Sequence, residues 1–376
     1  MKILYYMPYD DSYMSQWQFF QIFDELSHYD ITFELFNPWH YDSYEEANEA
    51  LLKNVRTEKS IDLFMSCVSS KMLFPSTMRE IHRLPIPKLL ICYDNLHAPF
   101  MHKEIAKYFD LVWLTSLETE TMFNKWGCNT IFQPYASNPF AFSDLYEKNI
   151  GKVGFVGTPY GTRSMMFNIL TEGGIDVDVF CKPNYASNKA FHIHKADPIG
   201  IKDMAVSIAQ HLSFPIGRKV LYSKIKKTIR PIPVLADSEH LTLKEKLSNE
   251  DMNKAYSNYA LSFNIITLRN TAVLKHPIQK LHLRTFEIPM CGGLELVEYN
   301  EELAGYFAED EIVFYKDKDE MIDKARYYTN PKNENLVRNM KLKARKRAET
   351  EHSWMRRFSV AFDALGLKYS NTADIK

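Results

Sequence analysis

Two side chains that could act as a general base follow a strand-like apolar run at Lys88–Cys92. Asp94 and His97 come directly after this run. A carboxylate can accept a proton, and a histidine with its ordinary pKa of about 6.5 does so near neutral pH. Asp10 and Asp11, which follow the strand-like start of the chain, compete for the same role. The structural alternative is that Asp94 caps the next helix and that His97 lies in its first turn.

Arg284 and Glu287 form a second pair of residues that could take part in binding or catalysis. Their spacing of three residues places both on one face of a helix. On spacing alone, an i,i+3 surface ion pair explains them as well as a shared ligand-binding face does. The following Gly292-Gly293 predicts the end of that helix, because glycine adopts the left-handed conformation of a C-cap. Leu294–Val297 then predicts a short buried strand.

The motif RTFEIPMCGG at residues 284–293, followed by a short strand and an acidic helix, resembles the C-terminal signature of CgeB-like (spore-maturation-type) glycosyltransferases. This resemblance implies a GT-B fold of class α/β, in which two Rossmann-like parallel-sheet domains face a cleft. It also implies that Arg284 and Glu287 face a sugar-nucleotide donor, with the glutamate on the ribose hydroxyls. A carboxylate suits that task because it only accepts hydrogen bonds. The match covers most of residues 151–181 and 250–360 and, more loosely, residues 86–140.

Retaining glycosyltransferases carry an E-x7-E motif whose second glutamate precedes a similar glycine turn. Glu287 occupies that second position, so the first would fall at position 279, which is Gln279. Glu287 and Glu295 are also separated by seven residues, but Glu295 follows the turn, and we do not interpret this pair as the motif. Whether the anomeric configuration is inverted or retained therefore stays open, and a retaining mechanism needs no acceptor base.

A second strand–turn–helix pattern begins at Val153–Val156 and continues through Gly157, Thr158 and Arg163. Small residues at such a turn let a ligand approach the backbone. A run FVG followed by a loop and an arginine is also a recurring feature of the family that the chain resembles. The turn is not a G-x-G-x-x-G fingerprint, so a plain strand-to-helix connection is the alternative.

The loop before Arg284 contains Lys275 and His276, followed by Pro277. Proline suits the first position of a helix, so we predict that the helix carrying Arg284 begins at Pro277. Its N-terminus would then form an anion-binding site flanked by Lys275 and His276. The expected donor-binding residues are Gly157, Thr158, Arg163, Lys275, His276, Arg284 and Glu287, and the expected catalytic residues are Asp94 and His97.

Strands alternate with helices along the first part of the chain and again after about residue 150, which predicts parallel doubly wound sheets. Such sheets bind ligands at the carboxyl ends of their strands. A length of 376 residues exceeds what one hydrophobic core supports. We predict an acceptor-side domain at 1–148 and a donor domain at 149–352. By the resemblance, a C-terminal helix at about 353–376 packs back on the first domain.

The composition of the chain restricts the classes of partner and the cellular location that we expect for it. The net charge of −1 gives no electrostatic argument for nucleic acid. The five cysteines are scattered without a C-x-x-C pair, which indicates free thiols in a reducing cytosol. The sequence shows neither an apolar run of about 18 residues nor a signal-peptide pattern, so a cytoplasmic protein is expected.

No carboxylate or histidine cluster in the sequence predicts a metal site. Asp176-x-Asp178 begins a strand and Asp317-x-Asp319 caps a helix, so both are interpreted as structural. The pair His192-x-His194 has no acidic neighbour beside it. We therefore expect metal-independent transfer without a cofactor, the nucleotide-diphosphate sugar being a substrate.

The segment 218–230 contains six basic residues and no acidic one. Leu221, Ile225 and Ile229 recur every four residues, which predicts a basic amphipathic helix. A solvated face is the simpler interpretation. The alternative is contact with an anionic surface, which would place the protein peripherally at the inner face of a membrane.

These observations predict a hexosyltransferase-type enzyme that moves a sugar from a nucleotide-diphosphate sugar to a glycan, lipid-linked or protein acceptor, in bacterial surface glycan or glycoconjugate synthesis. A non-catalytic sugar-nucleotide or glycan-binding protein on the same scaffold, or a GT-B epimerase, are the alternatives, because a fold does not fix function. The absence of a G-x-S-x-G elbow and of a P-loop leaves hydrolase and kinase activities without support.

Overall fold

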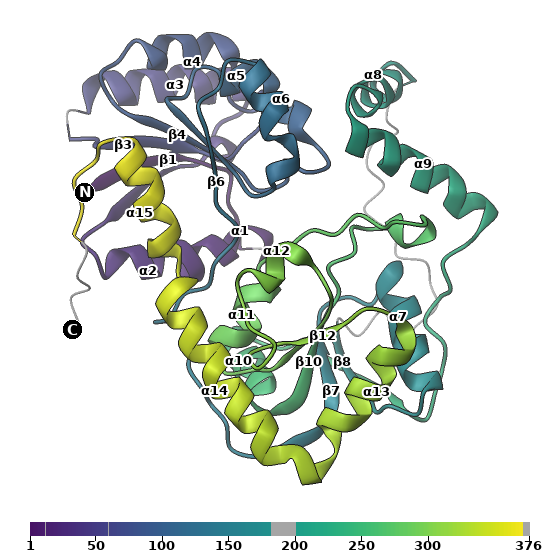
Figure 1. Cartoon of the computed structure of the whole chain (residues 1–376). Helices are drawn as coiled ribbons and strands as arrows, with labels where there is room; N and C mark the ends of the chain where they lie inside the picture. Colours follow the sequence, from purple (N-terminus) through teal and green to yellow (C-terminus); the bar gives the residue numbers. More distant parts are fainter. Residues whose placement is uncertain (12, 59, 182–200, 371–376) are drawn as a thin grey trace. The chain divides into compact units, whose positions relative to one another are not determined.

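The computed structural model describes residues 1–11, 13–58, 60–181 and 201–370 (Figure 1). The chain divides into two compact units. Unit 1 comprises Met1–Ala141 and His352–Lys376, and unit 2 comprises Phe142–Glu351. The chain thus passes from unit 1 to unit 2 after Ala141 and returns to unit 1 at His352.

Unit 1 is built on a six-stranded parallel sheet in the order β2-β1-β3-β4-β5-β6. Its strands are β1 (Lys2–Tyr6), β2 (Thr32–Phe36), β3 (Leu63–Ser66), β4 (Lys88–Cys92), β5 (Leu111–Leu114) and β6 (Thr130–Phe132). Every residue of β3, β4 and β5 is buried. Apolar strands of this kind are stable in a parallel sheet because helices cover both of its faces.

The helices of unit 1 connect these strands, except for the last, which enters the unit from unit 2. They are α1 (Tyr13–Gln18), a π-helical turn at Phe19–Phe23, α2 (Asp24–Ser27), α3 (Tyr44–Thr57), α4 (Pro75–His82), α5 (Lys103–Ala106), α6 (Glu120–Lys125) and α15 (Trp354–Ala364). Short 3-10 turns lie at Pro38–His40, Pro99–His102 and Leu117–Thr119.

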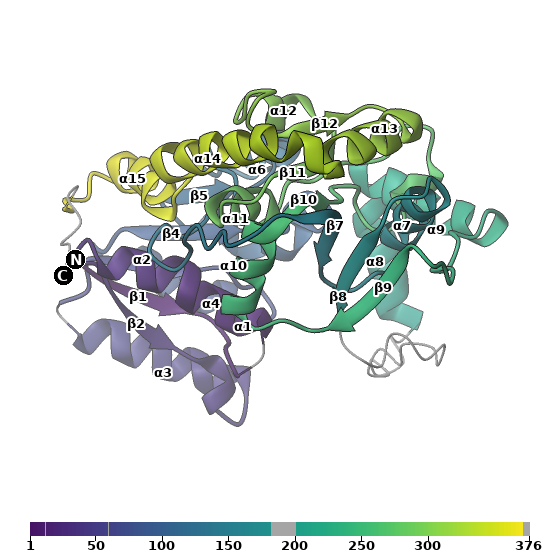
Figure 2. The same cartoon turned by 90° about the horizontal axis from the view of Figure 1, so that it is seen from below.

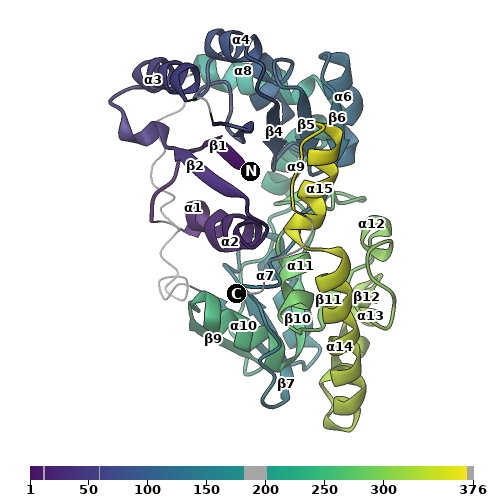
Figure 3. The ribbon, with the colours of Figure 1, turned by 90° about the vertical axis from the view of Figure 1, so that its left-hand side faces the viewer.

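The last helix, α15, packs against α2 and β5 (Figure 3). The buried carboxylate of Glu25 accepts hydrogen bonds from the backbone N–H groups of Trp354 and Met355, at 3.0 and 2.7 Å. These are donors that the start of a helix leaves without an intrahelical partner. The contact fixes a segment more than 300 residues distant in sequence to the first helices of unit 1.

Unit 2 is built on a second six-stranded parallel sheet, in the order β12-β11-β10-β7-β8-β9. Its strands are β7 (Ile150–Val156), β8 (Val177–Cys181), β9 (Leu241–Glu245), β10 (Tyr259–Asn264), β11 (Glu295–Glu298) and β12 (Val313–Tyr315). Its helices are α7 (Thr162–Glu172), α8 (Ile201–Leu212), α9 (Pro215–Ile229), α10 (Asn249–Asn258), α11 (Arg284–Met290), α12 (Glu301–Ala304), α13 (Lys318–Thr329) and α14 (Glu334–Glu351), with 3-10 turns at η6 (Thr271–Val273) and η7 (Pro331–Asn333).

Both aspartate pairs have the structural roles that the sequence predicts. Asp178 is buried and accepts a hydrogen bond from the Tyr259 hydroxyl at 2.6 Å, and it forms an ion pair with Lys244 at 2.6 Å. It therefore joins β8, β9 and β10. Asp317 caps α13 by accepting from the backbone N–H groups of Asp319 and Glu320. The pair His192-x-His194 lies outside the described residues.

The predicted helix is confirmed as α9, although its apolar residues Ile225 and Ile229 are exposed. It packs against α8 to form a helical hairpin, and α9 also contacts η6 (Figure 1). Neither α8 nor β9 was predicted, because the segment from Tyr185 to Leu247 has no clear pattern in the sequence.

Candidate functional site

Helix α11 begins at Arg284, and the predicted start at Pro277 is wrong. The backbone groups before Arg284 make other bonds. The N–H of Leu268 donates to the carbonyl of Ile278 at 2.7 Å, and the N–H of Lys280 donates to the carbonyl of Ile266 at 2.8 Å. The segment is therefore extended and pairs with the loop that follows β10. The predicted anion site at a helix N-terminus beside Lys275 does not form.

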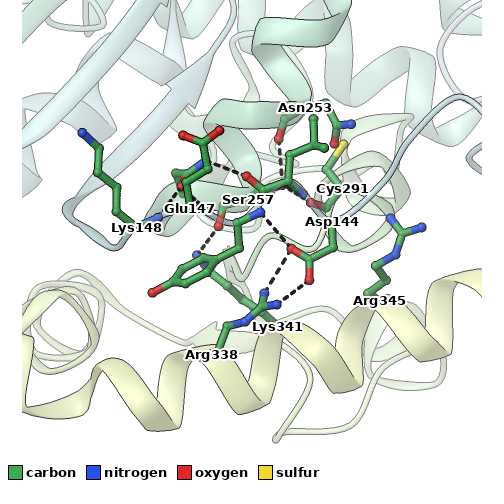
Figure 4. A network of polar contacts seen from close by, with 12 residues as sticks. Asp144, Glu147, Lys148, Asn253, Ser257, Cys291, Arg338, Lys341 and Arg345 are labelled. Atoms are coloured by element: carbon green, nitrogen blue, oxygen red, sulfur yellow. Dashed lines mark hydrogen bonds and ion pairs between the residues drawn. The ribbon is translucent and has the colours of Figure 1, made fainter.

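Helix α11 ends at Met290 with Cys291 as its C-cap, and Gly292 follows with a φ of 69°, so the predicted helix end at the two glycines is confirmed. A Cβ atom at Gly292 would lie 2.9 Å from Oδ1 of Asp144. Asp144 forms a bidentate pair with Arg338 of α14, at 3.1 and 2.6 Å (Figure 4). Glycine is thus needed both for the left-handed backbone and for the close approach of the ion pair.

Further polar contacts hold this turn in place. The hydroxyl of Ser257 donates to the carbonyl of Cys291 at 2.5 Å, and Lys341 of α14 donates to the carbonyl of Ser257 at 2.8 Å (Figure 4). Arg345 donates to the carbonyl of Met290. Helix α14 runs beside α11 (Figure 2). The position of Arg284 and Glu287 is therefore set by a network that joins α10, α11 and α14.

Arg163 and Arg284 lie together at the carboxyl end of β7. Arg284 donates to the carbonyl of Val156 at 2.9 Å, and Arg163 donates to the carbonyl of Thr158 at 3.0 Å. Both guanidinium groups face the ring of Phe155, with their Cζ atoms 4.9 and 5.5 Å from its centroid. In the described part of unit 2, neither arginine has a carboxylate at ion-pair distance.

Gly157 makes this approach of the arginines possible. Its φ is 141°, a conformation that side chains with a Cβ atom rarely adopt, and a Cβ there would lie 3.0 Å from a guanidinium nitrogen of Arg284. The structure therefore brings together Gly157, Thr158, Arg163 and Arg284 of the predicted donor-binding residues. The alternative of a surface ion pair between Arg284 and Glu287 is not observed among the described residues.

The electrostatics of this cluster favour an anion. Burial, followed by the charge of Arg284, lowers the pKa of Arg163 to about 10. Burial and the charges of both arginines hold the pKa of His282 well below its usual range, so this imidazole is neutral. Two like charges share a site that an anionic group would stabilise.

Three further side chains in this region were not predicted as functional. Asn264 donates to Glu295 at 2.5 Å and to the Thr285 hydroxyl at 3.1 Å. Burial raises the pKa of Glu295 to about 8, although the hydrogen bond from Asn264 and the charge of Arg284 lower it. The signal in the sequence for Glu295 is a glutamate within the apolar run Leu-Glu-Leu-Val, an unusual place for a charged side chain.

Glu287 lies one turn after Arg284 and is only 4% exposed. Tyr256 of α10 is close enough to both residues for their charges to act on its phenol. Burial raises the pKa of this phenol most, the charge of Arg284 lowers it, and the charge of Glu287 raises it. Glu287 is thus part of the same region, but its side chain is buried in this conformation.

Lys275 and His276 are exposed, and among the described residues neither forms a hydrogen bond with the two arginines. Lys275 instead lines a cavity of about 420 Å³ together with Lys226, Arg230 and the segment Pro231–Pro233. None of the other predicted donor-binding residues lines this cavity.

The predicted catalytic residues belong to unit 1 and follow β4, as expected. Asp94 is exposed and His97 is half-buried. The next helical turn, Pro99–His102, has Ala98 as its N-cap without a side-chain cap, so the alternative that Asp94 caps it is wrong. Between the two candidates, the buried Asn95 donates to the Ser116 carbonyl and to the Thr119 hydroxyl, both at 2.6 Å. This anchors the loop to the end of β5. Asp10 and Asp11, the competing candidates, are exposed after β1 at the same edge of the sheet.

Among the described residues, no group of three or more His, Cys, Asp or Glu side chains is placed to hold a metal ion. In the same residues, no helix is both long and apolar enough to cross a membrane.

Comparison with known proteins shows which family models and solved structures this chain resembles. Residues 225–363 match a family model described as glycosyl transferase-like. An α-glucosyltransferase (AGT) solved with UDP superimposes with a TM-score of 0.60 at 12% identity, covering 97% of this chain and 100% of its own. HepE from Anabaena, solved with UDP-glucose, superimposes with a TM-score of 0.56 at 10% identity, and the match covers 98% of this chain and 100% of HepE. Sucrose-phosphate synthase from Thermosynechococcus elongatus superimposes with a TM-score of 0.55 at 10% identity, and the match covers 97% of this chain and 99% of the synthase.

The chain has the GT-B fold. The matched family model and these structures together support a GT-B glycosyltransferase. No curated protein matches the sequence. The family model begins within α9 and ends within α15, so it contains Arg284, Glu287 and Glu295.

Proposed function

We propose that this protein is a CgeB-like glycosyltransferase of hexosyl type, which moves a sugar from a nucleotide-diphosphate sugar to a glycan, lipid-linked or protein acceptor in bacterial surface glycan or glycoconjugate synthesis. The observation that carries the proposal is the pair formed by Arg163 and Arg284, two half-buried cations with no carboxylate partner among the described residues. A diphosphate group supplies the missing negative charge.

The chemistry of sugar transfer explains why two arginines are useful here. When the bond between the anomeric carbon and the diphosphate breaks, negative charge develops on the leaving diphosphate. Two planar guanidinium groups offer several donors and bind phosphate oxygens in a bidentate manner. Because the donors are already fixed by the Val156 and Thr158 carbonyls, little reorganisation is needed as charge develops. We propose that this cradle replaces a divalent metal ion.

Glu287 is proposed to hold the donor ribose, whose two hydroxyls donate to its carboxylate. Its enclosed position requires that donor binding expose this side chain. Lys275 and His276 stay candidate donor contacts from the loop after β10, but the diphosphate is assigned first to the two arginines.

On the acceptor side, we propose that Asp94 or His97 removes the proton of the acceptor hydroxyl if the reaction inverts the anomeric carbon. Both follow the carboxyl end of a parallel strand, where such sheets bind ligands. A retaining reaction would leave them without this role.

A thermal-shift screen of nucleotide sugars tests the donor, since a ligand that binds only the folded chain raises its stability by RT ln(1 + [L]/Kd). We expect one nucleotide-diphosphate sugar to raise the melting temperature and then to be consumed in the presence of an acceptor. Addition of EDTA should leave turnover unchanged. Loss of activity in EDTA that manganese restores would contradict metal-independent transfer, and binding without any turnover would favour a sugar-nucleotide-binding protein.

A further inference from the structure

The helical hairpin formed by α8 and α9 has a surface that the proposed sugar transfer does not use. Its second helix, with Arg230 at its end, contributes six basic residues and no acidic one: Arg218, Lys219, Lys224, Lys226, Lys227 and Arg230. Among the described residues, none of the six forms an ion pair, and Arg218 donates only to the Leu212 carbonyl, at 3.0 Å.

Helix α14 provides a comparison within the same unit, because it is also rich in basic residues. There three of the cations have acidic partners that belong to other segments of unit 2. Arg338 pairs with Asp144 at 2.6 Å, Lys343 pairs with Asp310 at 2.5 Å, and Arg347 pairs with Glu311 at 3.3 Å. The basic residues of α9 are therefore not explained by the fold of unit 2.

The exposed face of α9 is also apolar. Tyr222, Ile225 and Ile229 recur at spacings of three and four residues, which places them on one face of the helix. Ile225 is 61% exposed and Ile229 is 77% exposed. Because Lys226 lies four residues after Tyr222 and one after Ile225, cations border this apolar stripe.

Helix α8 adds a second stripe. Met204, Ile208 and Leu212 follow one another at spacings of four residues, so they share a face, and all three are exposed. A hairpin that exposes large aliphatic side chains on both of its helices would lose solubility unless a partner covers them.

The cavity described above lies at the C-terminal end of α9. Lys226 and Arg230 of the basic segment line it, together with Lys275 and the apolar side chains of Ile232 and Leu274. Three cations on an apolar-walled cavity fit a phosphate group attached to an apolar molecule.

We propose that the α8–α9 hairpin docks on an anionic lipid bilayer, with the apolar stripes at the level of the acyl chains and the basic residues on lipid phosphates. Helices with apolar stripes bordered by lysine and arginine bind membrane surfaces in this way. A protein partner with an acidic face would satisfy the cations, but it would not need two stripes of exposed aliphatic tips. The inference goes beyond the proposed function and does not depend on it.

Sedimentation with lipid vesicles tests the proposal, using the full chain without nucleotide sugar. We expect the protein to bind vesicles of phosphatidylcholine with 30% phosphatidylglycerol and not vesicles of phosphatidylcholine alone. Attraction to anionic lipid is worth about 1 kcal/mol per basic residue, which is about 5-fold in affinity. The double variant Lys224→Gln/Lys227→Gln should therefore bind roughly 30-fold more weakly.

The variant Ile225→Asp/Ile229→Asp should bind at least as poorly, since both side chains are exposed and their replacement leaves the core unchanged. The matched control is Lys332→Gln/Lys346→Gln, which removes two exposed lysines of unit 2 outside the hairpin and should bind vesicles as the unchanged chain does. Binding that ignores lipid charge, or hairpin variants that bind normally, would overturn the proposal. Retained nucleotide-sugar binding in the hairpin variants separates this outcome from a failure of the proposed function.

Discussion

At the residue scale, the proposed site depends on two half-buried arginines that lie close together. Arg163 and Arg284 face one phenylalanine ring and have no described acidic partner, so they raise the energy of the ligand-free chain. The sequence predicted both residues as donor contacts from the resemblance. It could not predict that they meet, because 120 residues separate them and only the parallel pairing of β7 with β10 brings their segments together.

We predict that Arg163→Gln does not destabilise the ligand-free chain, because it removes the repulsion between two half-buried cations. Chemical denaturation should give a free energy of unfolding within about 1 kcal/mol of the unchanged chain, the scale of one neutral hydrogen bond. A loss of several kcal/mol would show that Arg163 is structural.

We predict that Glu295 contributes to the pH dependence of the free energy of unfolding. Its folded-state pKa of about 8 lies above the ordinary value of 4.5, so the folded chain retains a proton that the unfolded chain releases. The free energy of unfolding from this group is thus fully present below the ordinary pKa and decreases as pH rises toward 8. Glu295→Gln should reduce this slope by up to about 1.4 kcal/mol per pH unit, measured by denaturation at pH 5 and pH 8. Identical slopes would mean that Glu295 is ionised in the folded chain.

For the acceptor base, Asp94→Asn and His97→Gln should be compared singly. The residue that acts as the base should lose at least roughly 100-fold in turnover while donor affinity is unchanged. Near-normal turnover in both variants would exclude this pair and make Asp10 and Asp11 the next candidates.

At the element scale, apolar strands were predicted well and loops were not. The predicted strand Lys88–Cys92 agrees with the bounds of β4, because short buried runs between turn signals have few alternatives. The helix expected from Pro277 failed because Ile278 and Leu281 are buried in an extended segment, where their spacing imitates a helical stripe. For α9, the period of four correctly predicted a helix, but its apolar side chains at Ile225 and Ile229 are exposed.

Gly157 lies in the turn after β7, and its replacement tests whether this turn shapes the proposed site. Gly157→Ala places a Cβ against Arg284 at a φ of 141°, so it should both destabilise the chain and weaken donor binding. Gly127→Ala is the matched control, since Gly127 also has a positive φ of 81° but has no atom within 4 Å of the added Cβ. It should cost only the backbone strain of about 1–2 kcal/mol. Equal donor affinity in the two variants would contradict a role for Gly157 at the site.

At the scale of the whole molecule, one chain builds two similar sheets and then returns to the first. The length and the alternation of strands and helices predict this arrangement, and the return of α15 was expected only from the resemblance. What the sequence could not show is the contact that fixes α15, because Glu25 is an acidic residue in an otherwise ordinary amphipathic segment.

We predict that Glu25→Ala destabilises unit 1 by about 2–4 kcal/mol, because two buried N–H groups of α15 lose their acceptor. Glu25→Gln keeps one acceptor oxygen and should cost less. Denaturation followed by tryptophan fluorescence measures both, since Trp354 is buried beside this contact. Donor binding in unit 2 should persist under conditions where both variants remain folded.

The central claim is that Arg163 and Arg284 together hold a diphosphate group. Calorimetric titration with UDP, and with inorganic diphosphate as a probe without a base, tests it most directly. We expect binding to the unchanged chain, and a loss on the order of 10- to 100-fold in Arg163→Gln and in Arg284→Gln, the scale of hydrogen bonds to charged groups. Arg326→Gln, which removes an exposed arginine paired with Asp323, should bind normally. Unchanged affinity in both site variants, or an equal loss in the Arg326 variant, would contradict the account.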